Sequence, residues 1–82
     1  MPTVLKFLGY RAVIYPNDHQ PCHVHVLGSG HEAVFWLVCP EGPPALRVNH
    51  GFRKRALTVI HRHLDDHLGV LCKKWSEIHG HH

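Results

Sequence analysis

The sequence predicts an α+β fold, a small antiparallel β-sheet of about four to five strands packed against one long C-terminal helix. In the first half of the chain, β-branched and aromatic residues alternate with turns that contain Gly and Pro. In the second half, apolar residues recur at steps of three and four, which is the period of an amphipathic helix. The chain has 82 residues, the length of one domain. We expect that domain to span residues 1–80, with 81–82 as a disordered tail.

The strand half divides at three predicted turns. Gly9 interrupts the apolar segment 3–15 and predicts a hairpin or a tight bend. Residues 16–21 contain two prolines, an asparagine and an aspartate, so they are predicted to turn. The segments CHVHVL and HEAVFWLV flank Gly28–Gly30, which is the clearest hairpin signal in the chain. The segment CPEGPP is a further turn, and a short strand is predicted after it at ALRV.

The helix half carries its apolar side chains on one stripe. The stripe consists of Leu57, Ile60, Leu64, Leu68, Leu71, Trp75 and Ile78. A helix from about Phe52 to Ile78 would be roughly 40 Å long, and its stripe is predicted to cover one face of the sheet. Asn49 is predicted to cap this helix near Gly51. Gly69, in the middle of the helix, weakens it by about 1 kcal/mol relative to alanine.

Composition and charge argue against several classes of protein. The formal charge is +3, and 44% of the residues are hydrophobic, which is ordinary for a folded globular protein. No apolar run approaches the roughly 20 residues of a membrane helix, and the N-terminus lacks the pattern of a signal peptide. We therefore expect no membrane association and a cytoplasmic location. Cys22, Cys39 and Cys72 are odd in number and form no C-x-x-C pair, so reduced thiols are expected.

Histidine is the unusual component, with eleven copies in the chain. His19, His23 and His25 lie beside Asp18 in the segment NDHQPCHVHV. Residues two apart on a strand share a face, so His23 and His25 would present two imidazoles side by side, whereas Cys22 would face away. From the preceding turn, His19 can fold back towards the pair. Asp18 could be a ligand itself or an acceptor that orients a histidine.

The helix offers further histidines for the same site. His63 and His67 are four residues apart, so they share one helix face beside the apolar stripe. If the helix packs on the sheet, one of them could reach the strand pair. Three imidazoles with an open fourth position would resemble a catalytic zinc site. A site closed by four protein ligands would resemble a structural one. The cofactor predicted on this basis is a divalent transition metal, namely Zn, Ni or Cu.

Two other interpretations compete with a metal site. The histidines could be hydrogen-bonded polar residues beside a turn, or they could serve metal-free acid–base or phosphate-directed chemistry. A 2H-type phosphoesterase would need two separated histidine–hydroxyl motifs, and this chain has one candidate. A cupin would need a longer barrel with a glutamate at a different spacing, so Glu32 does not fit that class. Arg53, Lys54 and Arg55 could contact phosphates, although a solvated helix face is the favoured explanation. Nucleic-acid binding is only weakly predicted, because no known DNA-binding motif is present.

Four segments carry a resemblance to a known family. They are MPTVLKFLGYRAVIY, NDHQPCHVHV, EAVFWL and the helix that contains RKRAL, His67 and Trp75. The chain resembles the small bacterial family called domain of unknown function 4160 (DUF4160). The family pattern falls on Asp18, His19, Pro21, His23, His25, Arg55, Leu57, His67 and Trp75. Cys22 stands where the family usually has a second proline. The resemblance implies His67, rather than His63, as the ligand from the helix.

The resemblance implies a binding or regulatory module of bacteria or phage, because genes of this family often stand in toxin–antitoxin-like pairs. We therefore predict such a module, with a histidine cluster at a functional surface and a homodimer or a small protein partner at the uncovered sheet face. The alternative is a metal- or histidine-dependent hydrolase such as a small nuclease. In either case, we predict that His23, His25 and His67 converge in one site, with His19 or Asp18 in contact.

Overall fold

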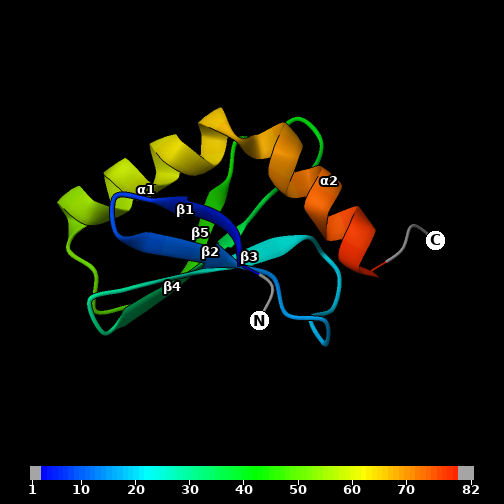
Figure 1. The fold of residues 1–82 in the computed structure, drawn as a ribbon. Helices are drawn as coiled ribbons and strands as arrows, with labels where there is room; N and C mark the ends of the chain where they lie inside the picture. The colour runs from blue at the N-terminus through cyan, green and yellow to red at the C-terminus, as the bar shows by residue number, and fades with distance from the viewer. Residues whose placement is uncertain (1–2, 80–82) are drawn as a thin grey trace.

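The computed structural model describes residues 3–79, which form a five-stranded antiparallel sheet and two helices. The elements are β1 (Thr3–Phe7), β2 (Tyr10–Val13), β3 (His23–Gly28), β4 (His31–Trp36), β5 (Ala45–His50), α1 (Lys54–Asp66) and α2 (Leu68–His79). The strands lie in sequential order, and both helices lie on one side of the sheet (Figure 1). The predicted α+β class is confirmed. The predicted boundary at residue 80 and the predicted tail 81–82 lie outside the described residues.

Two tight turns build the hairpins that the sequence predicts. Leu8–Gly9 joins β1 to β2 with φ values of 49° and 83°, and Ser29–Gly30 joins β3 to β4 with 51° and 78°. Positive φ at both central residues matches the right-handed twist of the flanking strands, and glycine reaches this region without steric cost. Both predicted hairpins are therefore confirmed, and the turn at Ser29–Gly30 sets the register of β3 on β4.

The core lies between the sheet and the helices. Val24 and Val26 of β3 are fully buried, and they belong to one apolar cluster with Leu64 and Leu71 of the helices. Side chains alternate along a strand, so the two valines face the helices. His25 stands between these valines and lies on the opposite face of the sheet. His25 thus lies on the face that the helices leave uncovered, whereas His23, the first residue of β3, also meets Trp75 of α2.

The second half of the chain is two helices, so the prediction of one long helix from Phe52 to Ile78 is wrong. His67 has φ −115° and ψ 20°, and this residue separates α1 from α2. Figure 1 shows the chain changing direction at that point. The buried apolar residues next to the break are Leu64, Leu68 and Leu71. The buried part of the stripe, which consists of Ile60, Leu64, Leu68, Leu71 and Trp75, continues across the break and belongs to one core cluster.

The sequence predicts Asn49 as the cap of the helix, and this prediction is wrong. Asn49 lies in β5, and its amide group donates to the carbonyl of Phe52 (2.9 Å) and accepts from the N–H of the same residue (3.0 Å). The helix cap is Arg53, which makes no side-chain capping hydrogen bond. The strand continues to His50, and the turn at Gly51 (φ 107°) follows before the helix begins. Asn49 therefore closes the turn between β5 and α1.

We expect Asn49→Ala to lower the free energy of unfolding by about 1 kcal/mol, because two hydrogen bonds to Phe52 are lost from a side chain that water reaches. Urea denaturation followed by circular dichroism measures this loss. Asn17→Ala is the matched control, since Asn17 is exposed and makes no side-chain hydrogen bond within residues 3–79. Equal losses of unfolding free energy in the two variants would mean that the hydrogen bonds from Asn49 to Phe52 do not stabilise the fold.

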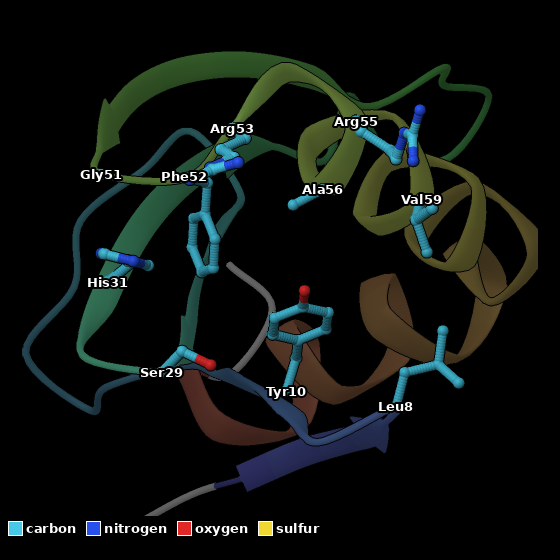
Figure 2. Close-up of a pocket in the computed structure, with 10 residues that line it drawn as sticks. All are labelled: Leu8, Tyr10, Ser29, His31, Gly51, Phe52, Arg53, Arg55, Ala56 and Val59. Carbon is cyan, nitrogen blue, oxygen red and sulfur yellow. The ribbon is translucent and has the colours of Figure 1, made fainter.

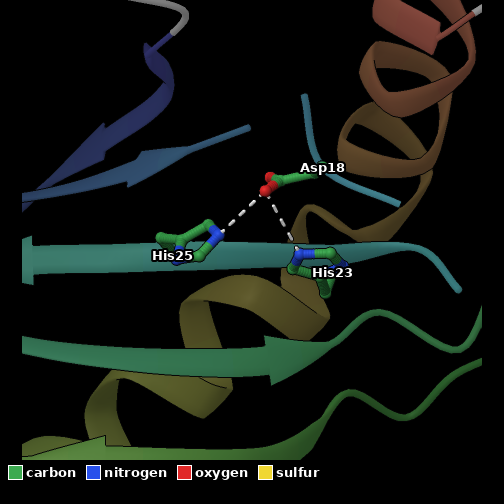
Figure 3. A group of neighbouring side chains, drawn as sticks. All are labelled: Asp18, His23 and His25. Carbon is green, nitrogen blue, oxygen red and sulfur yellow. Dashed lines mark hydrogen bonds and ion pairs between the residues drawn. The ribbon is translucent and has the colours of Figure 1, made fainter. Parts of the chain in front are cut away.

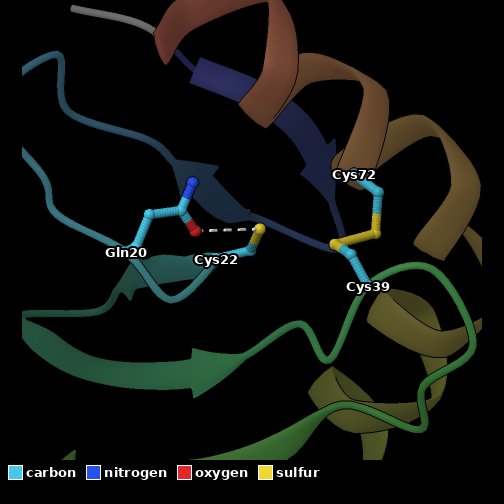
Figure 4. Close-up of a disulfide and its surroundings, with 4 residues drawn as sticks. All are labelled: Gln20, Cys22, Cys39 and Cys72. Carbon is cyan, nitrogen blue, oxygen red and sulfur yellow. Dashed lines mark hydrogen bonds between the residues drawn. A yellow bond between two sulfur atoms is a disulfide. The ribbon is translucent and has the colours of Figure 1, made fainter. Parts of the chain in front are cut away.

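Cys39 and Cys72 form a disulfide, which ties the loop after β4 to α2 (Figure 4). Their Cα atoms are 5.8 Å apart, and 33 positions separate them in the sequence. The prediction of reduced thiols is therefore wrong for this pair, because the fold brings together two cysteines whose spacing gives no sign of pairing. Cys22 is the free cysteine.

Burial raises the pKa of the Cys22 thiol, and a backbone hydrogen bond opposes this shift without cancelling it. A higher pKa leaves less thiolate at pH 8, so iodoacetamide should modify Cys22 more slowly in the native protein than in urea. Mass spectrometry of the unreduced native protein should show a single adduct. Three adducts on unreduced protein would contradict the disulfide, and equal rates with and without urea would contradict the shift.

Candidate metal centre

The carboxylate of Asp18 is positioned by the turn that precedes β3. Asp18 donates its backbone N–H to the carbonyl of Tyr15 (3.0 Å), and Pro16 occupies the second position of this turn, where proline is favoured. The N–H of Tyr15 in turn donates to Oδ2 of Asp18 (3.0 Å). One carboxylate oxygen is therefore engaged by the backbone. The other, Oδ1, is directed at β3 (Figure 3).

Two imidazoles of β3 face this oxygen. Nε2 of His25 lies 3.3 Å from Oδ1 of Asp18, and Nε2 of His23 lies 3.6 Å from it (Figure 3). The three atoms all lie within 4.8 Å of one another. Within residues 3–79, no other three His, Cys, Asp or Glu side chains come as close. The prediction that His23 and His25 lie side by side is confirmed, with ring centroids 5.3 Å apart.

The remaining ring nitrogens have fixed partners. Nδ1 of His23 lies 2.8 Å from the carbonyl oxygen of Pro21, and Nδ1 of His25 lies 3.1 Å from Oε2 of Glu32. A carbonyl and a carboxylate only accept hydrogen bonds, so each Nδ1 must carry the hydrogen. In a neutral imidazole, the lone pair then sits on Nε2. Nε2 of His25 is also within hydrogen-bond distance of Oδ1 of Asp18 (3.3 Å), and it donates to that oxygen when the ring is protonated. When both rings are neutral, two lone pairs and a carboxylate oxygen face one another, which is an arrangement that a cation between them would stabilise.

Glu32 is a residue of this site that the sequence analysis did not select. In the β3–β4 pairing, Glu32 is opposite Leu27 and His25 is opposite Val34. Glu32 is therefore a diagonal neighbour of His25 on the same face of the sheet, within reach of a long side chain. The predicted hairpin at Gly28–Gly30 already contained this signal, because its register determines which residues of β4 face His25.

Aromatic side chains surround the histidine pair. The centroid of the His23 ring lies 5.2 Å from the ring centroid of Trp75 in α2 and 6.0 Å from that of Trp36 in β4. The ring centroids of Tyr15 and His25 are 4.9 Å apart. His23 is only 7% exposed, and partial exclusion of water strengthens electrostatic interactions at its Nε2. The helices therefore contribute a tryptophan to this site.

His67, the predicted ligand from the helix, lies elsewhere. Its Nδ1 donates to the carbonyl of His63 (2.8 Å), and its ring stacks on His63, which in turn stacks on Phe7 of β1. The helices cover the face of the sheet opposite His25. His67 is absent from the close group of Asp18, His23 and His25, so its predicted convergence with the two histidines is wrong.

The other predicted site residues take different places. His19 is exposed and lines the same hollow as the histidine pair, but it is outside the close group. The predicted contact from the turn is made by Asp18. Cys22 packs against the core and donates to Oε1 of Gln20 (3.7 Å), so it lies outside the close group and faces away from the histidine pair, as the alternation of the strand predicts (Figure 4).

The predicted phosphate-contact residues lie at the other end of β3. Arg53 and Arg55 line a hollow of about 520 Å³, with Tyr10 and Phe52 on its wall (Figure 2). Lys54 is exposed at the start of α1. This hollow is larger than the one at the histidines, but it is mainly apolar and contains no close group of metal-ligating side chains. The smaller hollow is therefore the candidate metal centre.

A family model described as a domain of unknown function (DUF4160) matches residues 9–76. The chain belongs to this family. The resemblance predicted from the sequence is thus confirmed, and the DUF4160 match contains the whole site from Tyr15 to Trp75. Searches of the curated proteins and of the solved structures found no significant match. Among the described residues of this DUF4160 protein, neither helix is long and apolar enough to cross a membrane.

Proposed function

We propose that this chain is a small binding module that holds a divalent transition-metal ion between Asp18, His23 and His25. The supporting observation is that both imidazoles engage Nδ1 with a fixed acceptor and turn Nε2 towards one carboxylate oxygen. Histidine ligands of metals are held in this way, because the second hydrogen bond sets the tautomer and the ring orientation. In this proposal, Glu32 and the carbonyl of Pro21 orient the two ligands.

Two of the three separations between ligand atoms are close to those around a tetrahedral ion. Ligand atoms bound at about 2.0–2.1 Å in a tetrahedron lie about 3.3–3.4 Å apart, and the two distances from Nε2 to Oδ1 of Asp18 are 3.3 and 3.6 Å. All three atoms lie within 4.8 Å of one another, so in this proposal the two imidazoles close on the ion when it binds. Two imidazoles and a carboxylate suit zinc best, and nickel or copper also accept imidazole nitrogen.

Elemental analysis of tag-free protein tests this proposal, combined with thermal unfolding in the presence of ZnCl₂, NiCl₂ or CuCl₂. We expect about one equivalent of metal and a higher melting temperature on loading. The His23→Ala/His25→Ala double variant should lose both properties. The His63→Ala/His67→Ala double variant is the matched control and should keep them, because this pair lies outside the site. Less than about a tenth of an equivalent in the parent, with no ion shifting its melting temperature, would refute the proposal.

Metal-dependent hydrolysis is the alternative function, and the number of ligands favours it. Three protein ligands leave a fourth position open for water, as in catalytic zinc sites, where the bound water has a pKa of about 7. We propose a small nuclease as this alternative, with His23 and His25 as ligands. RNA and DNA cleavage assays with Zn, Mn, Ni or Mg test it. The absence of cleavage with all four ions, together with no toxicity on expression in the host, would remove it.

We also propose that a protein partner or a second copy of the chain pairs with the free edge of β5. All six residues of this strand are exposed, including Leu46 (46%) and Val48 (38%), and β5 pairs only with β4 among the described strands. The free edge of a strand presents unpaired N–H and C=O groups that another chain can bind. A partner encoded beside this gene, as in a toxin–antitoxin pair, would serve this purpose. Light scattering at micromolar concentration that shows only a monomer, with no partner retrieved from the native host, would contradict this proposal.

A further inference from the structure

Strand β5 carries an irregularity close to the candidate metal centre. Val34 pairs with Val48 and Phe35 pairs with Leu46, so Arg47 is an extra residue without a partner on β4. A β-bulge of this kind re-aims one side chain, and bulges are over-represented beside functional sites. The guanidinium of Arg47 lies over the ring of Trp36, with Cζ 5.0 Å from the ring centroid.

Through Trp36 of β4, Arg47 of β5 is linked to His23 of β3. Trp36 is the Cα partner of His23, and its ring meets the imidazole edge-on with the centroids 6.0 Å apart. The cation–π contact holds the guanidinium on this face of the sheet. Arg47 forms no ion pair with any residue between 3 and 79. Its hydrogen-bond donors are therefore available to a ligand.

The guanidinium and the candidate metal ligands line one hollow of about 300 Å³. Its wall includes Asp18, His23, His25, Trp36 and Arg47, and the exposed His19 lies on it as well. We infer that this hollow binds a phosphate group, with one oxygen at the open position of the metal and another on Arg47. This inference rests on the proposed metal site and names the class of ligand that the site takes.

Charge and geometry both favour a phosphate group. Asp18 and Glu32 together offset the two positive charges of a divalent ion, so Arg47 leaves the site with an excess of positive charge. The planar fork of a guanidinium matches the spacing of phosphate oxygens, and such charge-assisted hydrogen bonds are the strong ones. A free phosphate ion and a phosphate monoester share this chemistry. The experiment therefore includes both.

Cobalt(II)-substituted protein gives a direct test, because the visible spectrum of cobalt reports on its ligands. Inorganic phosphate and phenyl phosphate are titrated separately into the cobalt-loaded protein. We expect saturable spectral changes, and we expect Arg47→Ala to weaken phosphate binding about tenfold or more, with cobalt affinity unchanged. Arg47→Lys should recover part of the loss. Arg62→Ala, an exposed arginine of α1 outside the hollow, is the matched control.

The outcomes separate this inference from the proposal on which it rests. Equal phosphate affinity in the parent and in a folded Arg47→Ala variant would overturn the phosphate site and leave the metal site standing. Failure of the parent to bind cobalt or zinc would overturn both. Binding of phenyl phosphate as tightly as inorganic phosphate would support a monoester as the ligand, whereas binding of inorganic phosphate alone would support the free ion. Urea denaturation of each variant verifies that it is folded.

Discussion

Replacing Cys39 and Cys72 together by alanine is expected to lower the free energy of unfolding by about 3–4 kcal/mol. The disulfide closes a loop between residues 33 positions apart, and opening it restores conformational freedom to the unfolded chain. A short chain builds only a small core, so this loss is a large part of its total stability. For a domain of this length, the melting temperature should fall by roughly 12–30 °C. Differential scanning calorimetry and urea denaturation measure the two quantities.

The matched control for the disulfide is Cys22→Ala, which removes the free cysteine. Cys22 is partly buried, so its loss should cost no more than about 1 kcal/mol. A reductant should destabilise the parent to the level of the double variant and should leave the double variant unchanged. A parent that melts at the same temperature with and without reductant would argue against a stabilising disulfide.

Replacing Asp18 by asparagine is expected to weaken zinc binding by about two orders of magnitude or more, because the charged ligand is lost. Asparagine retains an oxygen that can accept from the N–H of Tyr15, so the turn should persist. Glu32→Ala should weaken binding about 10- to 100-fold, which is the usual effect of removing the partner of a ligating histidine. Competition with a chromophoric chelator ranks the affinities.

Glu77→Ala is the matched control for these acidic residues. Glu77 pairs with Lys74 on the exposed surface of α2 (3.7 Å), outside the site, so zinc affinity should remain that of the parent. An equal loss in Glu77→Ala and Glu32→Ala would mean that net charge, and not the hydrogen bond from His25 to Glu32, determines the affinity. Unchanged affinity in the Asp18→Asn variant would remove Asp18 from the ligand set.

Several features of this chain follow from neighbouring residues alone. The hairpins depend on Leu8–Gly9 and Ser29–Gly30, whose backbone conformations are local properties. The pairing of His23 and His25 follows from the alternation of a strand, and the position of Asp18 follows from a four-residue turn with Pro16. Family membership follows in the same way, since the quoted segments lie within the matched residues or overlap them. Interactions over a few residues are sufficient for all of these.

The remaining features depend on which distant segments meet. The break at His67 leaves the apolar residues of both helices in one core cluster, and His67 lies outside the close group that contains His25. The pairing of Cys39 with Cys72 requires the loop after β4 to reach α2. The position of Arg47 over Trp36 depends on a bulge in β5. Sequence periodicity carries no information on these distances, because they are set by the packing of the whole sheet against both helices.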